Sequence, residues 1–226
     1  MSLDLERIKG LCFDVDGTLS DTDDAWVERI TRILAPQSGL LSPHEARHFG
    51  RWLVMTTESP MNMLYYWMDA LSLDDNFARL YEKLAQKNVK SRKRFTIMDG
   101  ARELLDRARV QYPLTVVSAR DELTTSRFLD QFELTKHFIE IVTSQTCDHT
   151  KPYPQPVVHA ARRMGLEPQE CLMIGDTTVD VLAGKRAGAQ TVGLLCGFGT
   201  ERELRRAGAD VILDNLPQLA NLLKLD

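Results

Sequence analysis

The sequence predicts an α/β fold: a doubly wound parallel sheet with an inserted α-helical domain. Two observations predict it. Short apolar runs alternate with amphipathic helical patterns over most of the 226 residues, and one long interval contains helical patterns alone. Such alternation is typical of βαβ units, in which helices connect parallel strands. The length suits one large domain, or a core domain with an insertion.

Six apolar runs of strand length are predicted as strands, and helical patterns follow them. The predicted strands are 11–13, 114–117, 138–142, 172–174, 191–195 and 211–213. The predicted helices are 100–111, 121–132, 154–164, 178–187, 200–207 and 216–224. We therefore expect a Rossmann-like sheet with a helix after each strand but the first.

The interval 20–95 contains no strand pattern and is predicted as a helical cap domain, which leaves 1–19 and 96–226 as the core. Its helical patterns lie at 21–34, 42–54, 60–71 and 73–89, with Pro36, Pro43 and Pro60 between or at their ends. The methionine-rich and aromatic run 61–68 is interpreted as core of this domain. We expect the domain to pack over the sheet.

Composition excludes several classes of protein. A hydrophobic share of 43%, a charged share of 27% and a net charge of −4 are those of a soluble globular protein and disfavour nucleic-acid or membrane partners. The basic run 87–94 is interpreted as a solvated helix end, with phosphate steering as the alternative. No apolar run approaches the ~20 residues of a membrane span. The N-terminal residues lack a signal-peptide pattern.

The four cysteines form no CxxC pair, and Cys12, Cys171 and Cys196 lie in apolar stretches. They are therefore interpreted as small reduced core residues, and the expected compartment is the cytoplasm.

Polar residues follow several of the predicted strands. Asp14 and Asp16 come directly after the first strand, Ser118 after the second, and Asp176 after the fourth, with Asp180 four residues later. The carboxyl ends of parallel strands meet at one edge of a sheet, where ligands bind, so these side chains are expected to converge. Two carboxylates two positions apart on a strand repel each other unless a cation lies between them.

Lys151 precedes Pro152, a residue suited to the first position of a helix. That placement puts a cation at the positive end of the helix dipole, which is unfavourable by up to about 1 kcal/mol. The lysine is favoured there if the site holds an anion such as phosphate.

Together these residues predict phosphoryl-transfer chemistry. Asp14, Asp16 and Asp176 offer the hard oxygen donors that Mg²⁺ prefers. One aspartate could attack phosphorus and the other could donate a proton to the leaving oxygen.

Each residue also has a plainer explanation. Asp-Gly is a common turn, Ser118 could cap a helix, and Asp176 and Asp180 could be first-turn acids. The joint occurrence of the pieces favours the site. By contrast, three other aspartates are interpreted as stabilising the start of a helix: Asp21, Asp23 and Asp24. His149 is interpreted as a surface residue.

Other motifs are incomplete. Gly184-Lys185 lacks the upstream glycine of a P-loop, and 197–202 (GFGTER) lacks the third glycine of a dinucleotide fingerprint.

This set of motifs, in this order, resembles the haloacid dehalogenase-like superfamily of hydrolases. DVDGT (14–18) resembles the first motif, Ser118 the second, Lys151 the third and GDTTVD (175–180) the fourth. The segment 187–219 is similar to the phosphoglycolate-phosphatase-like branch.

The resemblance implies a role for each residue. Asp14 would be the nucleophile and a magnesium ligand, and Asp16 the general acid/base, with its backbone carbonyl on the metal. Ser118 and the amide of Ala119 would hold the phosphoryl oxygens. Lys151 would neutralise nucleophile and phosphate, Asp176 would complete the metal ligands, and Asp180 would orient Lys151 or a metal-bound water.

The implied activity is a magnesium-dependent phosphatase acting on a small phosphorylated metabolite through an aspartyl-phosphate. Relatives often carry Asn where this chain has Ala119, which weakens assignment of the substrate by analogy.

Asp16 argues against dehalogenase, ATPase and phosphonatase chemistry. A phosphosugar mutase keeps both aspartates and is the main alternative, followed by a non-catalytic phosphometabolite sensor. Arg51 in the cap is a candidate substrate contact, or else an exposed helix residue.

Overall fold

The computed structural model describes residues 3–21 and 95–225. They belong to one compact unit, which comprises Met1–Thr22 and Phe95–Asp226. Nearly all of the predicted cap, 20–95, lies outside the described residues, together with the runs 61–68 and 87–94, Arg51, Asp23 and Asp24. The boundaries and helical character of that domain therefore stay predictions.

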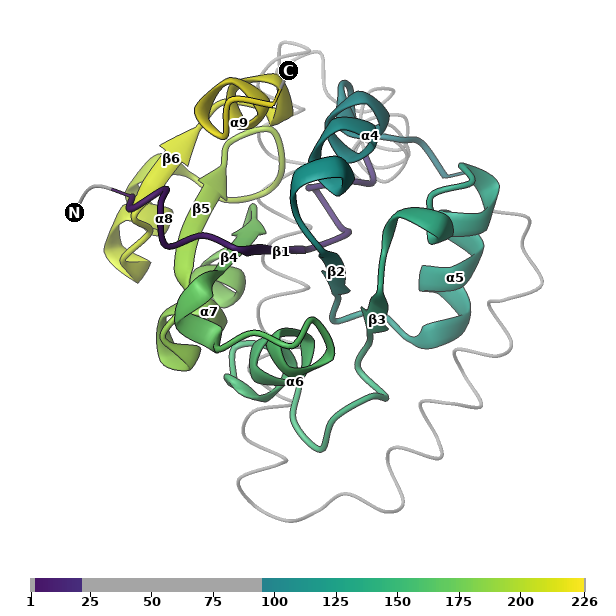
Figure 1. Ribbon diagram of the computed structural model, residues 1–226, viewed down its shortest axis with the longest axis horizontal. Helices are drawn as coiled ribbons and strands as arrows, with labels where there is room; N and C mark the ends of the chain where they lie inside the picture. Colours follow the sequence, from purple (N-terminus) through teal and green to yellow (C-terminus); the bar gives the residue numbers. More distant parts are fainter. Residues whose placement is uncertain (1–2, 22–94, 226) are drawn as a thin grey trace, which may run out of the picture. The chain divides into compact units, whose positions relative to one another are not determined.

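Six parallel strands form a single sheet in the order β3-β2-β1-β4-β5-β6 (Figure 1). Their bounds are β1 (Gly10–Phe13), β2 (Leu114–Val117), β3 (Glu140–Val142), β4 (Cys171–Gly175), β5 (Gln190–Leu194) and β6 (Val211–Leu213). Every neighbouring pair is parallel. The chain starts at β1 and adds strands first on one side and then on the other, which confirms the predicted doubly wound α/β fold.

The helices of the described residues agree with the predicted ones to within two residues at either end. They are α4 (Ala101–Gln111), α5 (Glu122–Gln131), α6 (Gln155–Arg163), α7 (Thr178–Ala187), α8 (Glu201–Ala207) and α9 (Leu216–Leu222). Two short 3₁₀ helices, η1 (Thr135–His137) and η2 (Pro168–Glu170), precede β3 and β4. None of the helices in these ranges is long and apolar enough to cross a membrane.

The central strands are buried on both faces, and alternate side chains point to different layers. Leu11 and Phe13 pack into a cluster with residues of α4, α5 and α9, whereas Cys12 packs into a second cluster with residues of α6 and α7. Because both faces are covered, β1 and β4 consist almost entirely of apolar residues, as in other parallel sheets. Figure 1 shows α6 and α7 on the side of the sheet opposite to α4 and α9.

The predicted third strand, 138–142, is too long by two residues. Phe138 ends η1, where its N–H donates to the carbonyl of Thr135, so it is not available to begin the strand ladder. Regular pairing with β2 begins at Glu140, opposite Thr115. The apolar character of 138–139 reflects partial burial of Phe138 against the core and not a longer strand.

The cysteines are all free thiols. Cys12 and Cys171 are buried, as expected of core residues, whereas Cys196 is only partly buried and lies at the edge of the core.

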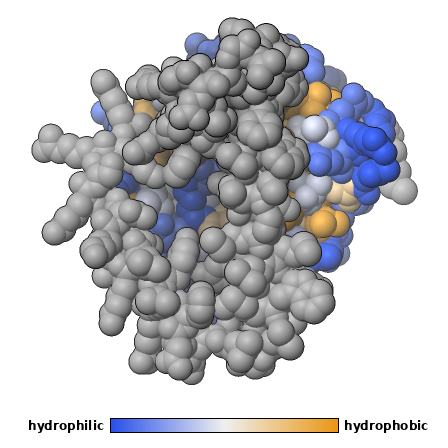
Figure 2. All heavy atoms as spheres, turned by 180° about the vertical axis from the view of Figure 1, so that it is seen from behind, coloured by the Kyte–Doolittle hydropathy of each residue, from blue (hydrophilic) through white to orange (hydrophobic). Residues whose placement is uncertain are grey.

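The described surface is mainly hydrophilic on the face shown in Figure 2, with smaller hydrophobic areas. Large apolar side chains are exposed at three of the described positions: Val110, Leu123 and Ile139. Single exposed apolar side chains of this kind are normal in globular proteins.

The two-sided core gives a direct test of the packing on α4. Leu105 is fully buried in that helix, and Val110, on its outer side, is 80% exposed. We expect Leu105→Ala to lower the free energy of unfolding by about 2–5 kcal/mol, because it leaves a cavity against the sheet. The matched change Val110→Ala should stay within about 0.5 kcal/mol. Urea denaturation measures both; equal losses would contradict the assigned burial.

Candidate active site

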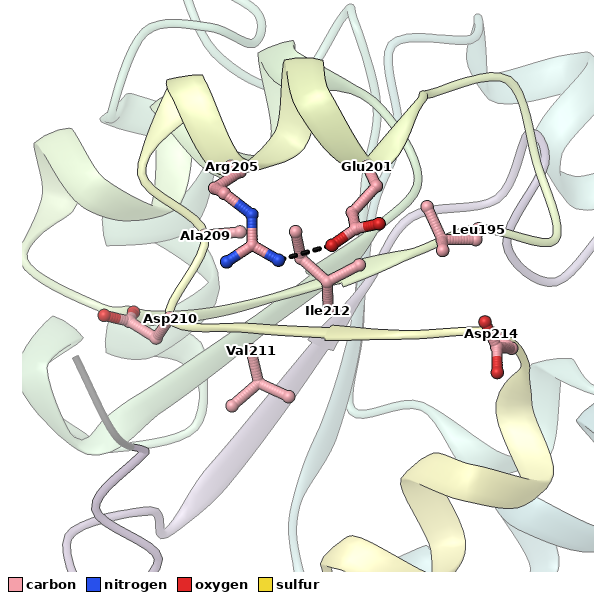
Figure 3. A pocket seen from close by; sticks show the side chains of 8 residues that line it. All are labelled: Leu195, Glu201, Arg205, Ala209, Asp210, Val211, Ile212 and Asp214. Atoms are coloured by element: carbon pink, nitrogen blue, oxygen red, sulfur yellow. Dashed lines mark hydrogen bonds and ion pairs between the residues drawn. The ribbon is translucent and has the colours of Figure 1, made fainter.

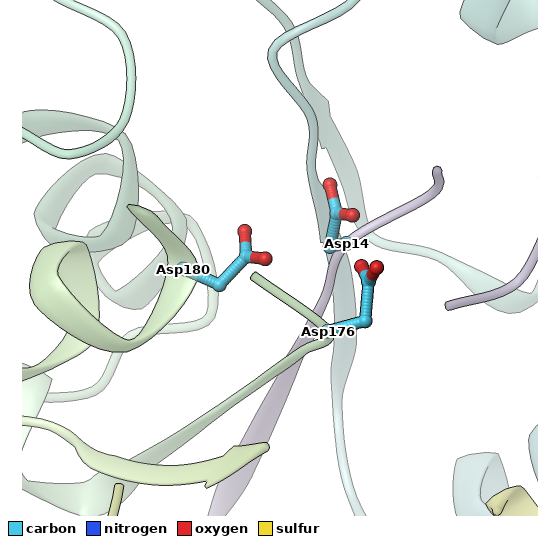
Figure 4. Close-up of side chains that lie close together, drawn as sticks. All are labelled: Asp14, Asp176 and Asp180. Atoms are coloured by element: carbon cyan, nitrogen blue, oxygen red, sulfur yellow. The ribbon is translucent and has the colours of Figure 1, made fainter. Parts of the chain in front are cut away.

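Three buried carboxylates meet at the carboxyl ends of the two central strands (Figure 4). Asp14 follows β1, Asp176 follows β4, and Asp180 lies in the first turn of α7. One oxygen of each lies within 4.8 Å of the others. They converge because β1 and β4 are neighbours in register, with Phe13 opposite Ile174, so both strands end at the same level.

The ammonium group of Lys151 lies between two of these carboxylates. Its Nζ is 2.5 Å from Asp14 Oδ1 and 2.5 Å from Asp180 Oδ1, and the lysine is buried. Three carboxylates therefore face one ammonium group. Full ionisation would leave two negative charges uncompensated in a region from which water is largely excluded. A bound cation would stabilise the ionised carboxylates there.

The protonation of the cluster reflects this imbalance. Burial raises the pKa of Asp14 to about 7; attraction by Lys151 opposes the rise, and repulsion by Asp180 and Asp16 adds to it. Burial also raises the pKa of Asp176 well above its ordinary value, with repulsion from Asp14 and Asp180 in the same direction. Burial alone would lower the pKa of Lys151, but attraction to Asp14 and Asp180 outweighs it and raises that pKa. The lysine is thus a permanent cation.

The position of Lys151 differs from the expected one. Helix α6 begins at Gln155 with Pro154 as its N-cap, so Pro152 is not the first helical residue. The expectation that Lys151 lies at the positive end of a helix dipole was therefore wrong. The lysine lies in the preceding turn, and its ion pairs with Asp14 and Asp180, from two other segments, account for its burial.

Asp180 makes contacts that fit both of the roles considered for it. Its Oδ2 accepts hydrogen bonds from the N–H and the hydroxyl of Thr177, which forms a capping box at the start of α7. Its Oδ1 accepts from Lys151. The helix cap therefore orients the carboxylate that holds the lysine.

Asp176 is enclosed by residues that the sequence reasoning missed. Its carboxylate accepts from the Thr18 hydroxyl at 3.2 Å and from the Phe198 N–H at 2.7 Å. A Cβ at Gly17 or Gly197 would approach Asp176 Oδ2 to 2.3 or 2.1 Å. The GFG run was considered only as an incomplete dinucleotide motif, but its glycines permit close approach of the backbone to Asp176. The signal available in the sequence was the pair of glycines two residues apart.

Asp16 lies near this cluster but outside it. Its carboxylate is partly exposed and forms an ion pair with the guanidinium of Arg120, a residue that the sequence reasoning did not single out. Repulsion from Asp16 also raises the pKa of Asp14.

Ser118 follows β2 and is buried, and Ala119 beside it is exposed. The Ser118 Oγ accepts a hydrogen bond from the Arg120 N–H at 3.1 Å. The cap of helix α5 is Asp121, which accepts from the Thr124 N–H, so Ser118 is not a helix cap. The Ser118 hydroxyl oxygen therefore stabilises the turn between β2 and α5.

His149 is partly buried and not simply a surface residue. Its ring stacks on Tyr153 with centroids 4.6 Å apart, in the turn that carries Lys151.

The described residues also line a pocket beside α8 and β6 (Figure 3). Its lining includes Glu201 and Arg205, which form an ion pair with each other, and none of the three clustered aspartates. Its other two charged residues already have partners, since Asp210 pairs with Lys185 and Asp214 accepts from Gln218, so this pocket is a weaker candidate than the aspartate cluster.

The clustered residues fit a divalent cation. Asp14 and Asp176 supply hard oxygen donors whose mutual repulsion a cation would relieve, as their raised pKa values indicate. Asp180 is less suited as a direct ligand, because its two oxygens already serve Lys151 and Thr177. A buried aspartate cluster that can hold a metal is therefore present.

Comparison with known proteins agrees with this geometry. The family model described as haloacid dehalogenase-like hydrolase matches residues 11–194. The chain belongs to this family. A phosphoglycolate phosphatase of Chromobacterium violaceum is 26% identical over 98% of this chain and 99% of its own. Pyrophosphatase PpaX of Bacillus velezensis is 28% identical over 96% of this chain and 97% of its own.

A hydrolase from Pseudomonas syringae of known crystal structure is 29% identical, with a TM-score of 0.72 over 96% of this chain and 98% of its own. The resemblance to the phosphoglycolate-phosphatase-like branch is confirmed. The predicted enzyme class, a phosphatase of the haloacid dehalogenase-like superfamily, is confirmed with it.

The glycine at 197 gives a prediction for the site. In Gly197→Ala the new methyl group would meet the Asp176 carboxylate, which must move. We expect activity and affinity for magnesium to fall by about 10–100-fold, as for other changes to groups that support a metal ligand.

Gly165→Ala is the control, since no described atom lies within 4 Å of its Cβ position although its φ is +71°. That change should lower stability by about 1 kcal/mol without affecting activity. Phosphate release and magnesium titration measure the difference, and full activity of Gly197→Ala would contradict the described contact.

Proposed function

We propose that this enzyme is a magnesium-dependent phosphatase that hydrolyses a small phosphomonoester through an aspartyl-phosphate on Asp14. The observation that carries the proposal is the buried contact of Lys151 with Asp14, beside Asp176, at the carboxyl ends of β1 and β4. This combination suits a nucleophilic carboxylate that must approach a dianionic phosphate.

Asp14 is the proposed nucleophile. An ionised carboxylate is required for attack on phosphorus, and Lys151 favours that form by direct ion pairing. As the carboxylate oxygen forms its bond to phosphorus, the bond to the leaving oxygen breaks. Water then attacks the aspartyl-phosphate, releases inorganic phosphate and restores the carboxylate.

Ser118 and Ala119 are the proposed donors to the phosphoryl oxygens. Because Ser118 Oγ accepts its hydrogen bond from Arg120 N–H, the hydroxyl hydrogen remains available for donation to an anion. The exposed position of Ala119 leaves its backbone accessible at the end of β2. Lys151 adds positive charge, which stabilises the charge that develops on the transferring group.

Asp16 is the proposed general acid and base. It is more exposed than Asp14, with 31% of its side chain accessible against 6%, so a leaving group and water can reach it. It would give a proton to the leaving oxygen in the first step and take one from water in the second.

Magnesium is the proposed cofactor, held by the carboxylates of Asp14 and Asp176 and the backbone carbonyl of Asp16. When bound, it would offset negative charge on the carboxylates and on the phosphoryl group. Asp180 orients Lys151 and supports the site from α7. Preference for magnesium over softer metals follows from a donor set of oxygens alone.

The proposed substrate is a small phosphorylated metabolite. Relatives of the full length are named phosphoglycolate phosphatase and pyrophosphatase, and both named activities imply a compact, anionic leaving group. The segment 20–95 would exclude larger substrates as a cap, and Arg51 within it would contact the leaving group. Phosphoproteins, nucleic acids and membranes are not proposed as substrates or partners, and the cytoplasmic location stays a prediction from the sequence.

The first test of this function is hydrolysis with a matched pair of variants. Purified enzyme with magnesium should release phosphate from small phosphomonoesters, including 2-phosphoglycolate. Asp14→Asn should reduce release to background and abolish stabilisation by beryllium fluoride, which mimics an aspartyl-phosphate. Asp130→Asn makes the same chemical change at an exposed position on α5 and should be as active as wild type.

The products separate a phosphatase from a mutase. With β-glucose 1-phosphate we expect free phosphate, and efficient formation of glucose 6-phosphate without phosphate release would favour the mutase. Lack of turnover on every compound would favour a sensor.

Magnesium should stabilise the protein more in alkaline than in acidic solution. The pKa of Asp14 is raised from 3.8 to about 7 in the fold, so without a cation this group destabilises the fold progressively as pH rises through that range. Magnesium must displace the same proton, so its affinity rises over the same range. The gain in Tm on adding magnesium should be larger at about pH 8 than at about pH 5.5. Asp176→Asn should lose most of the gain, and a gain independent of pH would contradict the proposed ligands.

A further inference from the structure

Arg120 connects two parts of the candidate site. Its backbone N–H donates to Ser118 Oγ, in the turn proposed to hold phosphate, and its side chain forms an ion pair with Asp16, the proposed acid and base. Its carbonyl oxygen accepts from the Ser144 N–H at 3.0 Å, which anchors the backbone to the segment after β3. Both ends of the residue are thus fixed by contacts close to the proposed chemistry.

The guanidinium is also held from a second direction. Its Cζ lies 5.4 Å from the centroid of the Phe95 ring, a distance that allows a cation–π interaction. Phe95 is itself fixed, because Gln131 exchanges two hydrogen bonds with its backbone and Phe128 packs edge-to-face on its ring. The Arg120 guanidinium therefore contacts both the Asp16 carboxylate and a Phe95 ring that is itself held in place.

The pair differs from the ordinary surface ion pairs of this protein. The side chains of Arg120 and Asp16 are 14% and 31% exposed, whereas those of Arg205 and Glu201 on α8 are 71% and 59% exposed. Exposed pairs contribute little and constrain little. A half-buried pair with an arginine fixed at both ends restricts the rotamer of the carboxyl group that it contacts.

We propose that Arg120 is a positioning residue for Asp16. It holds the carboxyl group over the mouth of the site so that the group can reach the oxygen of the leaving group. The inference rests on the proposed function, because it assigns Arg120 to the proton transfer of that reaction. Arg120 itself neither attacks nor transfers a proton.

The chemical consequence is a dependence on the leaving group. An alkoxide leaves poorly without a proton, so hydrolysis of an alkyl phosphate needs a well-placed acid. The p-nitrophenolate ion leaves as a stable anion, so hydrolysis of p-nitrophenyl phosphate depends far less on that acid. A residue that positions the acid should therefore affect the first substrate and largely spare the second.

The experiment compares kcat/KM for glycerol 2-phosphate and p-nitrophenyl phosphate in wild type and variants, with magnesium present. This ratio reports the steps up to formation of the aspartyl-phosphate, whereas kcat also contains its hydrolysis, in which Asp16 would act as the base for either substrate. In Arg120→Ala we expect kcat/KM for glycerol 2-phosphate to fall about 10–100-fold, a part of the 10²–10⁴ that general acids contribute, and kcat/KM for p-nitrophenyl phosphate to fall less than about threefold. Arg120→Lys should recover part of the loss, since it keeps the charge and loses the planar contact with Phe95.

Two further variants keep the test sharp. Phe95→Leu retains an apolar side chain but removes the ring beneath the guanidinium, and it should show a weaker loss with the same substrate dependence. Arg163→Ala removes another arginine, one that pairs with Glu140 away from the clustered aspartates, and it should leave kcat/KM for both substrates unchanged. Tm is measured for each variant, so that a loss of folded protein is recognised.

The outcomes are distinct. Equal losses of kcat/KM on both substrates in folded Arg120→Ala would overturn the positioning role. A rise in KM alone, of the same size for both substrates, would be such a result and would indicate direct substrate binding. If Arg120→Ala does not fold, the same criterion applies to Arg120→Lys and Phe95→Leu. Lack of hydrolysis of both substrates by wild type would contradict the proposed function itself, and with it this inference.

Discussion

The Lys151 ammonium group lies between the carboxylates of Asp14 and Asp180, and the other groups of the candidate site are arranged around this contact. It joins the end of β1, the turn before α6 and the first turn of α7. Loss of one partner from a buried ion pair costs about 3–5 kcal/mol, because the remaining charge stays without compensation. Full ionisation of the three carboxylates would leave the cluster with excess negative charge even with Lys151, so the cluster favours a further cation as well as the lysine.

Asp180 and the glycines around Asp176 show how closely fold and site are combined. The single carboxylate of Asp180 completes a helix cap with one oxygen and accepts from Lys151 with the other. Gly17 and Gly197 carry no side chain because the Asp176 carboxylate occupies the space where a Cβ would lie. Residues that would be assigned to helix capping or to loop flexibility therefore determine where the reactive groups lie.

The strand pattern was predictable, since β1, β2 and β4 are apolar runs flanked by turn residues. The aspartates that follow β1 and β4 converge, as a parallel sheet requires. The exact role of Pro152 was not predictable, because a proline suits both a first helical position and a preceding turn. The pairing of Arg120 with Asp16 spans 104 positions in sequence. The contact of Phe198 with Asp176 likewise depends on a loop conformation that no local pattern specifies. Contacts of this kind arise from tertiary packing. The sequence therefore indicated the candidate site residues better than the residues that hold them in place.

The two segments of chain that flank residues 22–94 are hydrogen-bonded to each other. Asp21 N–H donates to the Thr96 carbonyl, Met98 N–H donates to the Leu19 carbonyl, and Ser20 and Ile97 form an antiparallel bridge. The ends of the intervening segment are therefore adjacent, and the entropic cost of closing such a loop grows only slowly with its length. The chain therefore re-enters the sheet at a point fixed by its own N-terminal segment, so a change in the length of the intervening segment need not move β2 or the residues that follow it.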